Sequence, residues 1–261
     1  MNVLDFIDKK RKGEKITMIT CYDYTYAQLL AALPVDCLLV GDSAAMTMHG
    51  FSHTIPATIE MMRLHTAAVA RGAPNQFIIG DMPFLSHRSA LPEIMNDLKV
   101  LMQAGANAIK LEGASGNLDL IKHIVESGVP VMGHLGLTPQ SVHALGGYKV
   151  QGKTEAAEMR LLEEAKQLEA AGCFAIVLEC VPRTVAKKIT DSLEIPTIGI
   201  GAGKDTDGQV LVLQDLLGLN LQFRPKFAKA FVDGASLMQA GFQAFITDVQ
   251  TGRFPADEHS F

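Results

Sequence analysis

The segment at 108–113, Ala-Ile-Lys-Leu-Glu-Gly, combines apolar strand-like residues with two charges of opposite sign. Side chains alternate between the faces of a strand, so Lys110 and Glu112 point the same way, roughly 7 Å apart. A parallel strand covered on both sides is normally apolar on both faces. Two charges on one face are costly unless each is paired or binds a ligand. A structural Lys–Glu pair or a functional site explains the pattern, and the same anomaly on other strands favours the site.

Two further acidic residues, Asp42 and Asp81, follow apolar runs in a Gly-Asp context. A Gly-Asp after a strand is often a helix N-cap, which is the structural alternative. Together with Glu112, they would bring three carboxylates from neighbouring strands to one place, where like charges repel unless a cation neutralises them. Hard oxygen ligands without nearby Cys or a His pair select Mg²⁺ over zinc. We therefore predict a magnesium site at Asp42, Asp81 and Glu112.

Other polar residues near the strand ends could bind a substrate or act on it. Glu179 ends an apolar run and is expected to be desolvated, which favours a general base; a salt bridge to Arg183 is the alternative. Lys110 would supply a fixed positive charge to a substrate carboxylate or oxyanion. Ser43 has no adjacent His to activate it, so a substrate hydrogen bond suits it better than nucleophilic attack. His134 is either a substrate contact or a core imidazole.

The chain alternates between strand-like and helix-like stretches. The expected strands are 17–22, 36–41, 76–80, 108–111, 129–133, 175–179, 197–200 and 220–223. The expected helices are 24–33, 59–71, 92–104, 118–127, 154–171, 184–192, 209–217 and 235–249. A short amphipathic helix at 3–12 precedes them and is expected to cover one end of the fold.

Eight strand–helix units in about 250 residues predict a (β/α)8 TIM barrel, with a doubly wound open sheet as the competing architecture. Barrel enzymes carry their chemistry at the C-terminal ends of the strands, where the acidic residues fall. No linker, repeat or low-complexity tract divides the chain, so we expect a single domain over residues 1–261.

Composition narrows the class of function. The 261 residues are 48% hydrophobic and 20% charged, enough for a sizeable core. A net charge of −5 without a basic run argues against nucleic acid and against an anionic membrane surface. No apolar stretch approaches the roughly 20 residues of a spanning helix, and the charged N-terminus lacks a signal-peptide core. Four cysteines without paired spacing indicate reduced thiols in a cytoplasmic protein.

The residues resemble the ketopantoate hydroxymethyltransferase family over nearly the whole chain. The motifs that carry the resemblance include Val40-Gly41-Asp42-Ser43, Gly80-Asp81-Met82-Pro83, Lys110-Leu111-Glu112-Gly113, the run 133–141, the run 146–152 and Leu178-Glu179-Cys180. The resemblance implies a barrel of the phosphoenolpyruvate/pyruvate type with Mg²⁺ at Asp42, Asp81 and Glu112. It also implies a 2-oxo acid held by Asp42, Ser43, Asp81 and Lys110, with Glu179 as the proton acceptor.

The same resemblance implies a co-substrate, an assembly and a location. Family members take their one-carbon unit from 5,10-methylenetetrahydrofolate, form homo-oligomers (commonly decamers) and work in the cytoplasm on the route to pantothenate. The expected reaction is deprotonation of 3-methyl-2-oxobutanoate to an enolate, which attacks the folate-borne carbon. A magnesium-dependent lyase or aldolase on a similar barrel, and a barrel that only binds a metabolite, are the alternatives.

Overall fold

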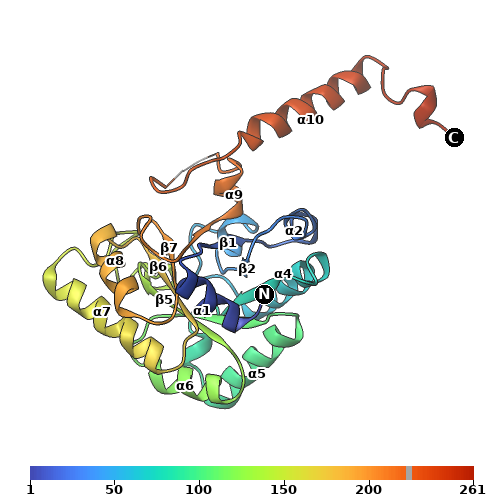
Figure 1. The fold of residues 1–261 in the computed structure, drawn as a ribbon. Coiled ribbons are helices and arrows are strands. Elements are labelled where there is room, and N and C mark those ends of the chain that lie inside the picture. The colour runs from blue at the N-terminus through green and yellow to red at the C-terminus, as the bar shows by residue number, and fades with distance from the viewer. Residues whose placement is uncertain (222–224) are drawn as a thin grey trace. The chain divides into compact units, whose positions relative to one another are not determined.

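Eight parallel strands form a closed barrel in the order of the sequence, in a computed structural model that describes residues 1–221 and 225–261 (Figure 1). The strands are β1 Ile16–Thr20, β2 Cys37–Val40, β3 Phe77–Asp81, β4 Ala108–Glu112, β5 Val131–Gly136, β6 Ala175–Glu179, β7 Thr197–Ile200 and β8 Gly208–Leu211. The predicted (β/α)8 barrel is confirmed, and the alternative of an open sheet is wrong.

Strand register places the charged residues beside one another at one end of the barrel. Asp81 on β3 is paired with Lys110 on β4, and Glu112 is paired with His134 on β5. Glu179 ends β6, opposite Gly136 of β5. Because all strands are parallel, these positions share the C-terminal mouth of the barrel.

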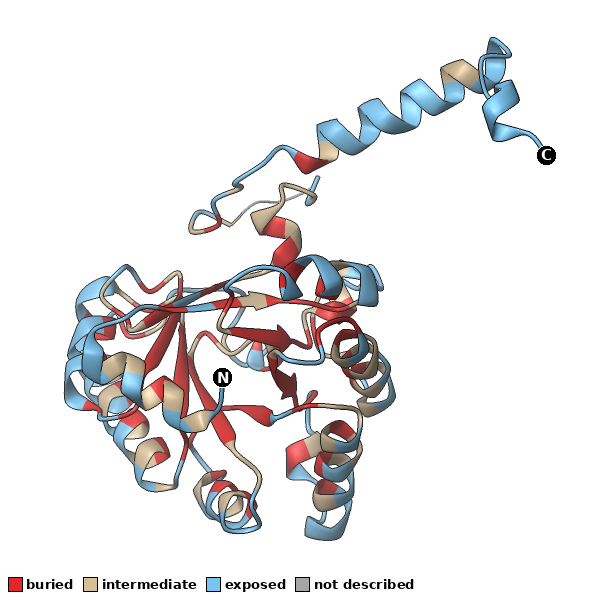
Figure 2. Ribbon diagram, turned by 45° about the vertical axis from the view of Figure 1, so that its right-hand side comes forward, coloured by how far each residue is buried: buried red, intermediate tan, exposed pale blue. Residues whose placement is uncertain are grey.

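Helices follow most strands and turn their apolar faces to the barrel, so burial concentrates in the strands and on the inner helix faces (Figure 2). In α5, the spacing of Ile94, Leu98 and Leu101 puts three buried side chains on one face. The helices of the barrel unit are α1 Val3–Lys12, α2 Tyr24–Ala31, α3 Ala44–Thr47, α4 Ile59–Gly72, α5 Leu91–Gln103, α6 Leu118–Glu126, α7 Glu155–Ala170 and α8 Arg183–Ser192. The short helix α3 was not expected from the sequence.

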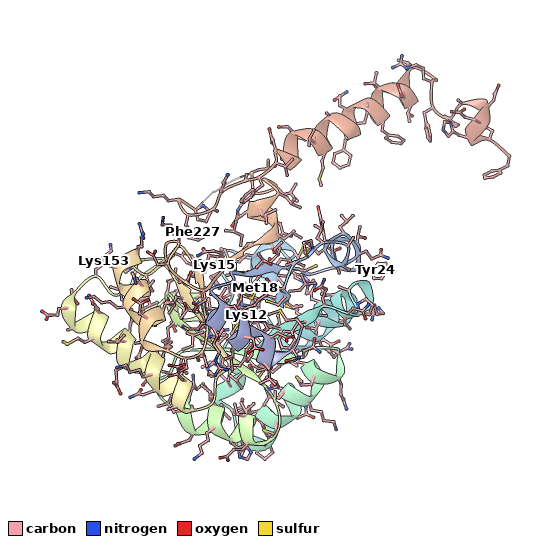
Figure 3. All side chains as sticks on the ribbon, in the orientation of Figure 1. Lys12, Lys15, Met18, Tyr24, Lys153 and Phe227 are labelled. Atoms are coloured by element: carbon pink, nitrogen blue, oxygen red, sulfur yellow. The ribbon has the colours of Figure 1, made fainter. Side chains whose placement is uncertain are left out.

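The first helix covers the N-terminal end of the barrel, as predicted. Phe6 is fully buried and its ring lies 5.3 Å from that of Phe77, at the start of β3, and 5.1 Å from that of Phe174, just before β6. Lys10 Nζ lies 3.0 Å from Asp207 Oδ2, before β8. Figure 3 labels Lys12 and Lys15, which flank the turn from α1 into β1. The helix therefore closes the end of the barrel opposite the charged residues.

One strand was placed wrongly. The eighth strand is Gly208–Leu211, which pairs with both β7 and β1, whereas the sequence suggested a helix over 209–217 and a strand over 220–223. Residues 220 and 221 are not in a strand, and 222–223 lie outside the described residues. Only α9, Leu213–Leu216, remains of the expected helix.

Two compact units make up the described chain: residues 1–212, which contain the barrel, and residues 213–261. The second unit contains α9 and α10, Gly234–Gln250, close to the predicted 235–249. The expectation of one domain over 1–261 stays a prediction. No helix in the described residues is long and apolar enough to cross a lipid bilayer.

Candidate active site

A buried lysine joins two acidic residues at the mouth of the barrel. Lys110 Nζ lies 2.8 Å from Asp81 Oδ2 and 3.9 Å from Glu112 Oε1. All three side chains are almost fully buried. Burial disfavours the ammonium, but the negative charges of Asp81, Glu112 and Asp42 outweigh it and raise the Lys110 pKa. Lys110 is therefore a permanent cation in the site, and its closest partner is Asp81, not the Glu112 that the sequence suggested.

His134 connects this cluster to Glu179. Its Nδ1 lies 3.3 Å from Glu112 Oε1, and its Nε2 lies 3.3 Å from Glu179 Oε2. Burial and nearby Lys110 disfavour the imidazolium, yet the two carboxylates raise the His134 pKa to about 9. The side chain of Glu179 is 16% exposed, whereas that of His134 is 3% exposed. Glu179 is thus the carboxylate of this chain of charges that a substrate can reach.

Gln140, in the 3-10 turn Pro139–Ser141 that follows β5, ties three strand ends together. Its Nε2 donates to Asp42 Oδ2 at 3.0 Å and to the Met82 carbonyl at 2.9 Å. Its backbone N–H donates to Glu112 Oε2 at 3.1 Å. A neutral amide orients the Asp42 carboxylate without cancelling its charge.

The carboxylates of the cluster differ in how readily they ionise. Burial, then the charges of Asp81 and Glu112, raise the pKa of Asp42 well above its usual value. Burial also raises the pKa of Asp81, although Lys110 opposes the shift. Burial opposes ionisation of Glu112 too, but the hydrogen bond and charge of His134, with Lys110, lower its pKa. The surroundings of Asp42 therefore disfavour its ionised form, and a bound cation would reverse that preference.

Ser43 is held at the rim by a buried tyrosine. The Tyr22 hydroxyl and Ser43 Oγ are 2.7 Å apart, and burial raises the Tyr22 pKa to about 12. Tyr22 therefore stays neutral and fixes the serine hydroxyl beside Asp42, where it can accept or donate a hydrogen bond to a ligand.

Two structural alternatives, the helix N-caps and the Glu179–Arg183 salt bridge, are wrong. Ser43, not Asp42, is the N-cap residue of α3, and Asp81 is the last residue of β3. Arg183 pairs with Asp205 rather than with Glu179. His134 is a buried imidazole with two carboxylate partners, Glu112 and Glu179, and its contact with a substrate stays a prediction.

The donor set suits a hard divalent cation in part. Asp81 Oδ1 is buried and has no hydrogen-bond partner among the described residues, and the Asp42 carboxylate lies beside it, with the Asp42 N–H 3.2 Å from Asp81 Oδ2. Mg²⁺ is commonly bound by one or two carboxylates and completed by water and substrate oxygens. Asp42 and Asp81 fit that pattern. Within the described residues, no group of three or more His, Cys, Asp or Glu is arranged as a metal cage, so the role of Glu112 stays a prediction.

The structure thus brings together every residue that the sequence proposed for the site: Asp42, Ser43, Asp81, Lys110, Glu112 and Glu179. The contacts made by Tyr22 and Gln140 were missed. Gln140 lies in the run 133–141, which carries part of the family resemblance and was the available signal for that residue.

Solved structures with the same architecture define the class of fold. Phosphoenolpyruvate phosphomutase from Streptomyces platensis matches with a TM-score of 0.64 and 12% identity, covering 100% of this chain and 92% of that one. A 2,3-dimethylmalate lyase of the PEP mutase/isocitrate lyase superfamily matches with a TM-score of 0.61 and 13% identity, covering 99% and 91%. The chain therefore shares the barrel architecture of these proteins.

Sequence comparison is more specific. The profile of the ketopantoate hydroxymethyltransferase family matches residues 1–257. Proteins called 3-methyl-2-oxobutanoate hydroxymethyltransferase from Bdellovibrio bacteriovorus and Coxiella burnetii are 56% and 57% identical. The alignments cover 99% and 98% of this chain, and 98% and 96% of those relatives. The chain belongs to the ketopantoate hydroxymethyltransferase family, which is a family of enzymes.

Proposed function

We propose that the chain transfers a hydroxymethyl group from 5,10-methylenetetrahydrofolate to 3-methyl-2-oxobutanoate, on the route to pantothenate. The products are 2-dehydropantoate and tetrahydrofolate, and water supplies the hydroxyl oxygen. The observation that carries the proposal is the reachable Glu179 carboxylate, 3.3 Å from the buried His134 and on the same barrel mouth as the buried Lys110. That arrangement offers a base next to fixed positive charge, as proton removal beside a carbonyl requires.

Glu179 acts as the base that takes the C3 proton of the 2-oxo acid. His134 holds the Glu179 carboxylate through Nε2 and is itself held by Glu112 through Nδ1. Lys110 stabilises the negative charge that develops on the keto oxygen. Ser43, with Asp42, Asp81 and Lys110, positions the 2-oxo acid, and Tyr22 fixes the Ser43 hydroxyl.

Asp42 and Asp81 are the residues that would hold Mg²⁺, with Glu112 as the proposed third ligand. When bound there, the cation supplies Lewis-acid polarisation of the keto oxygen. A relative of the same fold, phosphonopyruvate hydrolase, was solved in complex with oxalate and Mg²⁺, with a TM-score of 0.64 and 11% identity. The raised pKa of Asp42, which a bound cation would lower, and the unpartnered Asp81 Oδ1 support the assignment in this chain.

Hydrogen–deuterium exchange at C3 of 3-methyl-2-oxobutanoate tests the base without folate. Followed by NMR in D₂O with Mg²⁺, the wild type exchanges the proton and Glu179→Gln loses about 10²–10⁴-fold in rate, because the amide cannot accept it. The variant keeps its affinity for Mg²⁺ and the keto acid, measured by calorimetry. Glu163→Gln, on the exposed surface of α7, is the matched control. Wild-type exchange in Glu179→Gln would contradict the assignment.

Turnover tests the overall reaction. Tetrahydrofolate release, measured with and without Mg²⁺ on several 2-oxo acids, should require the metal and favour 3-methyl-2-oxobutanoate. Cleavage of a 2-oxo acid without folate would instead indicate a lyase. We also propose a cytoplasmic homo-oligomer, with a decamer as the expected size; light scattering coupled to gel filtration measures that mass.

A further inference from the structure

A cavity of about 450 Å³ lies beside the candidate active site. The loops that follow β3, β4 and β5 line it, together with one side of α7. Glu112 belongs both to this wall and to the charged cluster, so the cavity borders the place where the 2-oxo acid is expected to bind. Its volume falls within the range of small-molecule sites.

One buried polar atom on the cavity wall has no hydrogen-bond partner among the described residues. It is Nδ1 of His87, a residue that is 7% exposed. Buried polar groups are nearly always paired with protein, water or ligand. A ligand with a hydrogen-bonding group along one edge would satisfy this atom.

The rest of the wall is suited to a flat ring. Phe84 and Leu85 line the cavity and are 37% and 54% exposed, so their apolar surfaces are accessible to a ligand there. Leu85 has φ 60°, a left-handed conformation that persists only where the surrounding structure imposes it. Arg88 secures the neighbouring loop by donating to the carbonyls of Ser115 and Gly116, both at 2.9 Å. Arg88 therefore links the loop after β3 to the loop after β4 at the edge of the cavity.

We propose that this cavity binds the nitrogen heterocycle of the one-carbon donor, with His87 at the polar edge of the ring and Phe84 and Leu85 against its face. The inference rests on the proposed function and names the subsite for its second substrate. A ring of the pterin class has both the in-plane donors and acceptors and the flat apolar faces that this wall requires. The shared Glu112 places that ring beside the 2-oxo acid.

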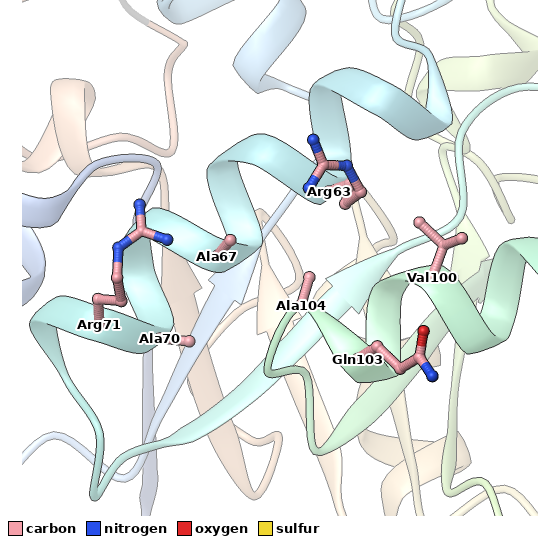
Figure 4. A pocket seen from close by; sticks show the side chains of 7 residues that line it. All are labelled: Arg63, Ala67, Ala70, Arg71, Val100, Gln103 and Ala104. Carbon is pink, nitrogen blue, oxygen red and sulfur yellow. The ribbon is translucent and has the colours of Figure 1, made fainter.

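A second cavity, of about 430 Å³, provides a matched control (Figure 4). It lies between α4 and α5 on the outside of the barrel and is lined by Arg63, Ala67, Ala70, Arg71, Val100, Gln103 and Ala104. It contains none of the charged residues of the barrel mouth, so filling it should leave both substrates unaffected.

Filling each cavity with an indole ring tests the assignment. Ala157 on α7 lines the proposed subsite, and Ala67 on α4 lines the control cavity. In Ala157→Trp, affinity for tetrahydrofolate by calorimetry should fall at least tenfold, and the KM for 5,10-methylenetetrahydrofolate should rise as much. That loss should exceed any loss in the C3 exchange rate, which needs no folate. Ala67→Trp should match the wild type. If Ala157→Trp misfolds, Ala144→Trp at the same cavity is the second variant.

The polar edge is tested at His87. Loss of one hydrogen bond to the ring should weaken tetrahydrofolate binding about three- to tenfold in His87→Phe. His87→Gln, which keeps donor and acceptor groups, should recover part of that loss. Tetrahydrofolate affinity unchanged in both Ala157→Trp and His87→Phe, in an enzyme whose wild type transfers the one-carbon unit, would overturn the subsite. A wild type that exchanges the C3 proton but neither binds nor uses folate would instead refute the proposed function.

Discussion

Replacing Gln140 by methionine removes one hydrogen-bonded amide and keeps nearly the same side-chain volume. Two bonds are lost, one to the Asp42 carboxylate and one to the Met82 carbonyl, while the backbone N–H bond to Glu112 remains. A hydrogen bond to a charged group contributes about 1.5–3 kcal/mol and a neutral one about 0.5–1.5 kcal/mol. The free energy of unfolding should therefore fall by roughly 2–4 kcal/mol, which lowers the melting temperature by about 5–15 °C.

The control is a glutamine with a similar contact at the surface. Gln167 Nε2 donates to Glu163 Oε1 at 3.1 Å on the exposed side of α7. There water replaces the lost partner, so Gln167→Met should cost less than about 0.5 kcal/mol. Urea denaturation of both variants without metal gives the comparison directly.

Metal affinity gives a second measurement for Gln140→Met. Loss of a group that orients a ligating carboxylate typically lowers metal affinity 10–100-fold. Calorimetric titration with Mg²⁺ should show that loss in Gln140→Met and none in Gln167→Met. If Gln140→Met is as stable as Gln167→Met and binds Mg²⁺ like the wild type, Gln140 does not orient Asp42 as we infer.

Three further changes test the electrostatics and the backbone. Folding raises the pKa of Asp42, so the folded protein binds this proton more tightly than the unfolded chain does. The metal-free protein should therefore lose stability as pH rises from the ordinary pKa of an aspartate to the raised one. The loss in that window is about 1.4 kcal/mol for each pH unit. In EDTA at pH 8, Asp42→Asn should therefore melt above the wild type; a lower melting temperature would contradict this. Burial, then Arg88, lowers the His87 pKa to about 4, so protonation is disfavoured in the folded state. Stability should fall by up to about 3 kcal/mol as pH drops from 6.5 to 4, and that fall should shrink in His87→Gln, as measured by urea denaturation across pH. Cys180 has φ 48°, so Cys180→Gly should be neutral or up to about 1 kcal/mol stabilising, whereas Cys180→Val should destabilise by more than about 1 kcal/mol. Equal melting temperatures for the two Cys180 variants would count against backbone strain at that residue.

The pattern of apolar residues in the sequence was sufficient to predict most strands of the barrel, because they are short apolar runs between helices. They failed at β8, where Gly208–Leu211 continues into more apolar residues and resembles a helix face. Periodicity alone does not separate a short buried strand from a helix. Residues 208–211 form a strand because they pair with β1, which lies nearly two hundred residues earlier in the chain.

The acidic residues and Lys110 could be predicted because a charge on an apolar strand is anomalous in any barrel. Their pairing could not, since it depends on strand register and on side chains from other elements. Gln140 illustrates the limit: a glutamine after a proline gives no sign that its amide will reach Asp42 and Met82. The unpartnered His87 is likewise visible only once the loops that bury it are folded.

The contact of Phe6 with Phe77 and Phe174 has a consequence for how the enzyme can change. Those rings anchor the far end of the strands, away from the reacting groups. Substitutions that sacrifice stability for a new substrate at the mouth can be offset by improved packing at the anchor, without altering any side chain that reacts. Directed evolution of acceptor specificity should therefore start from a variant with improved packing around Phe6, at the N-terminal end of the barrel.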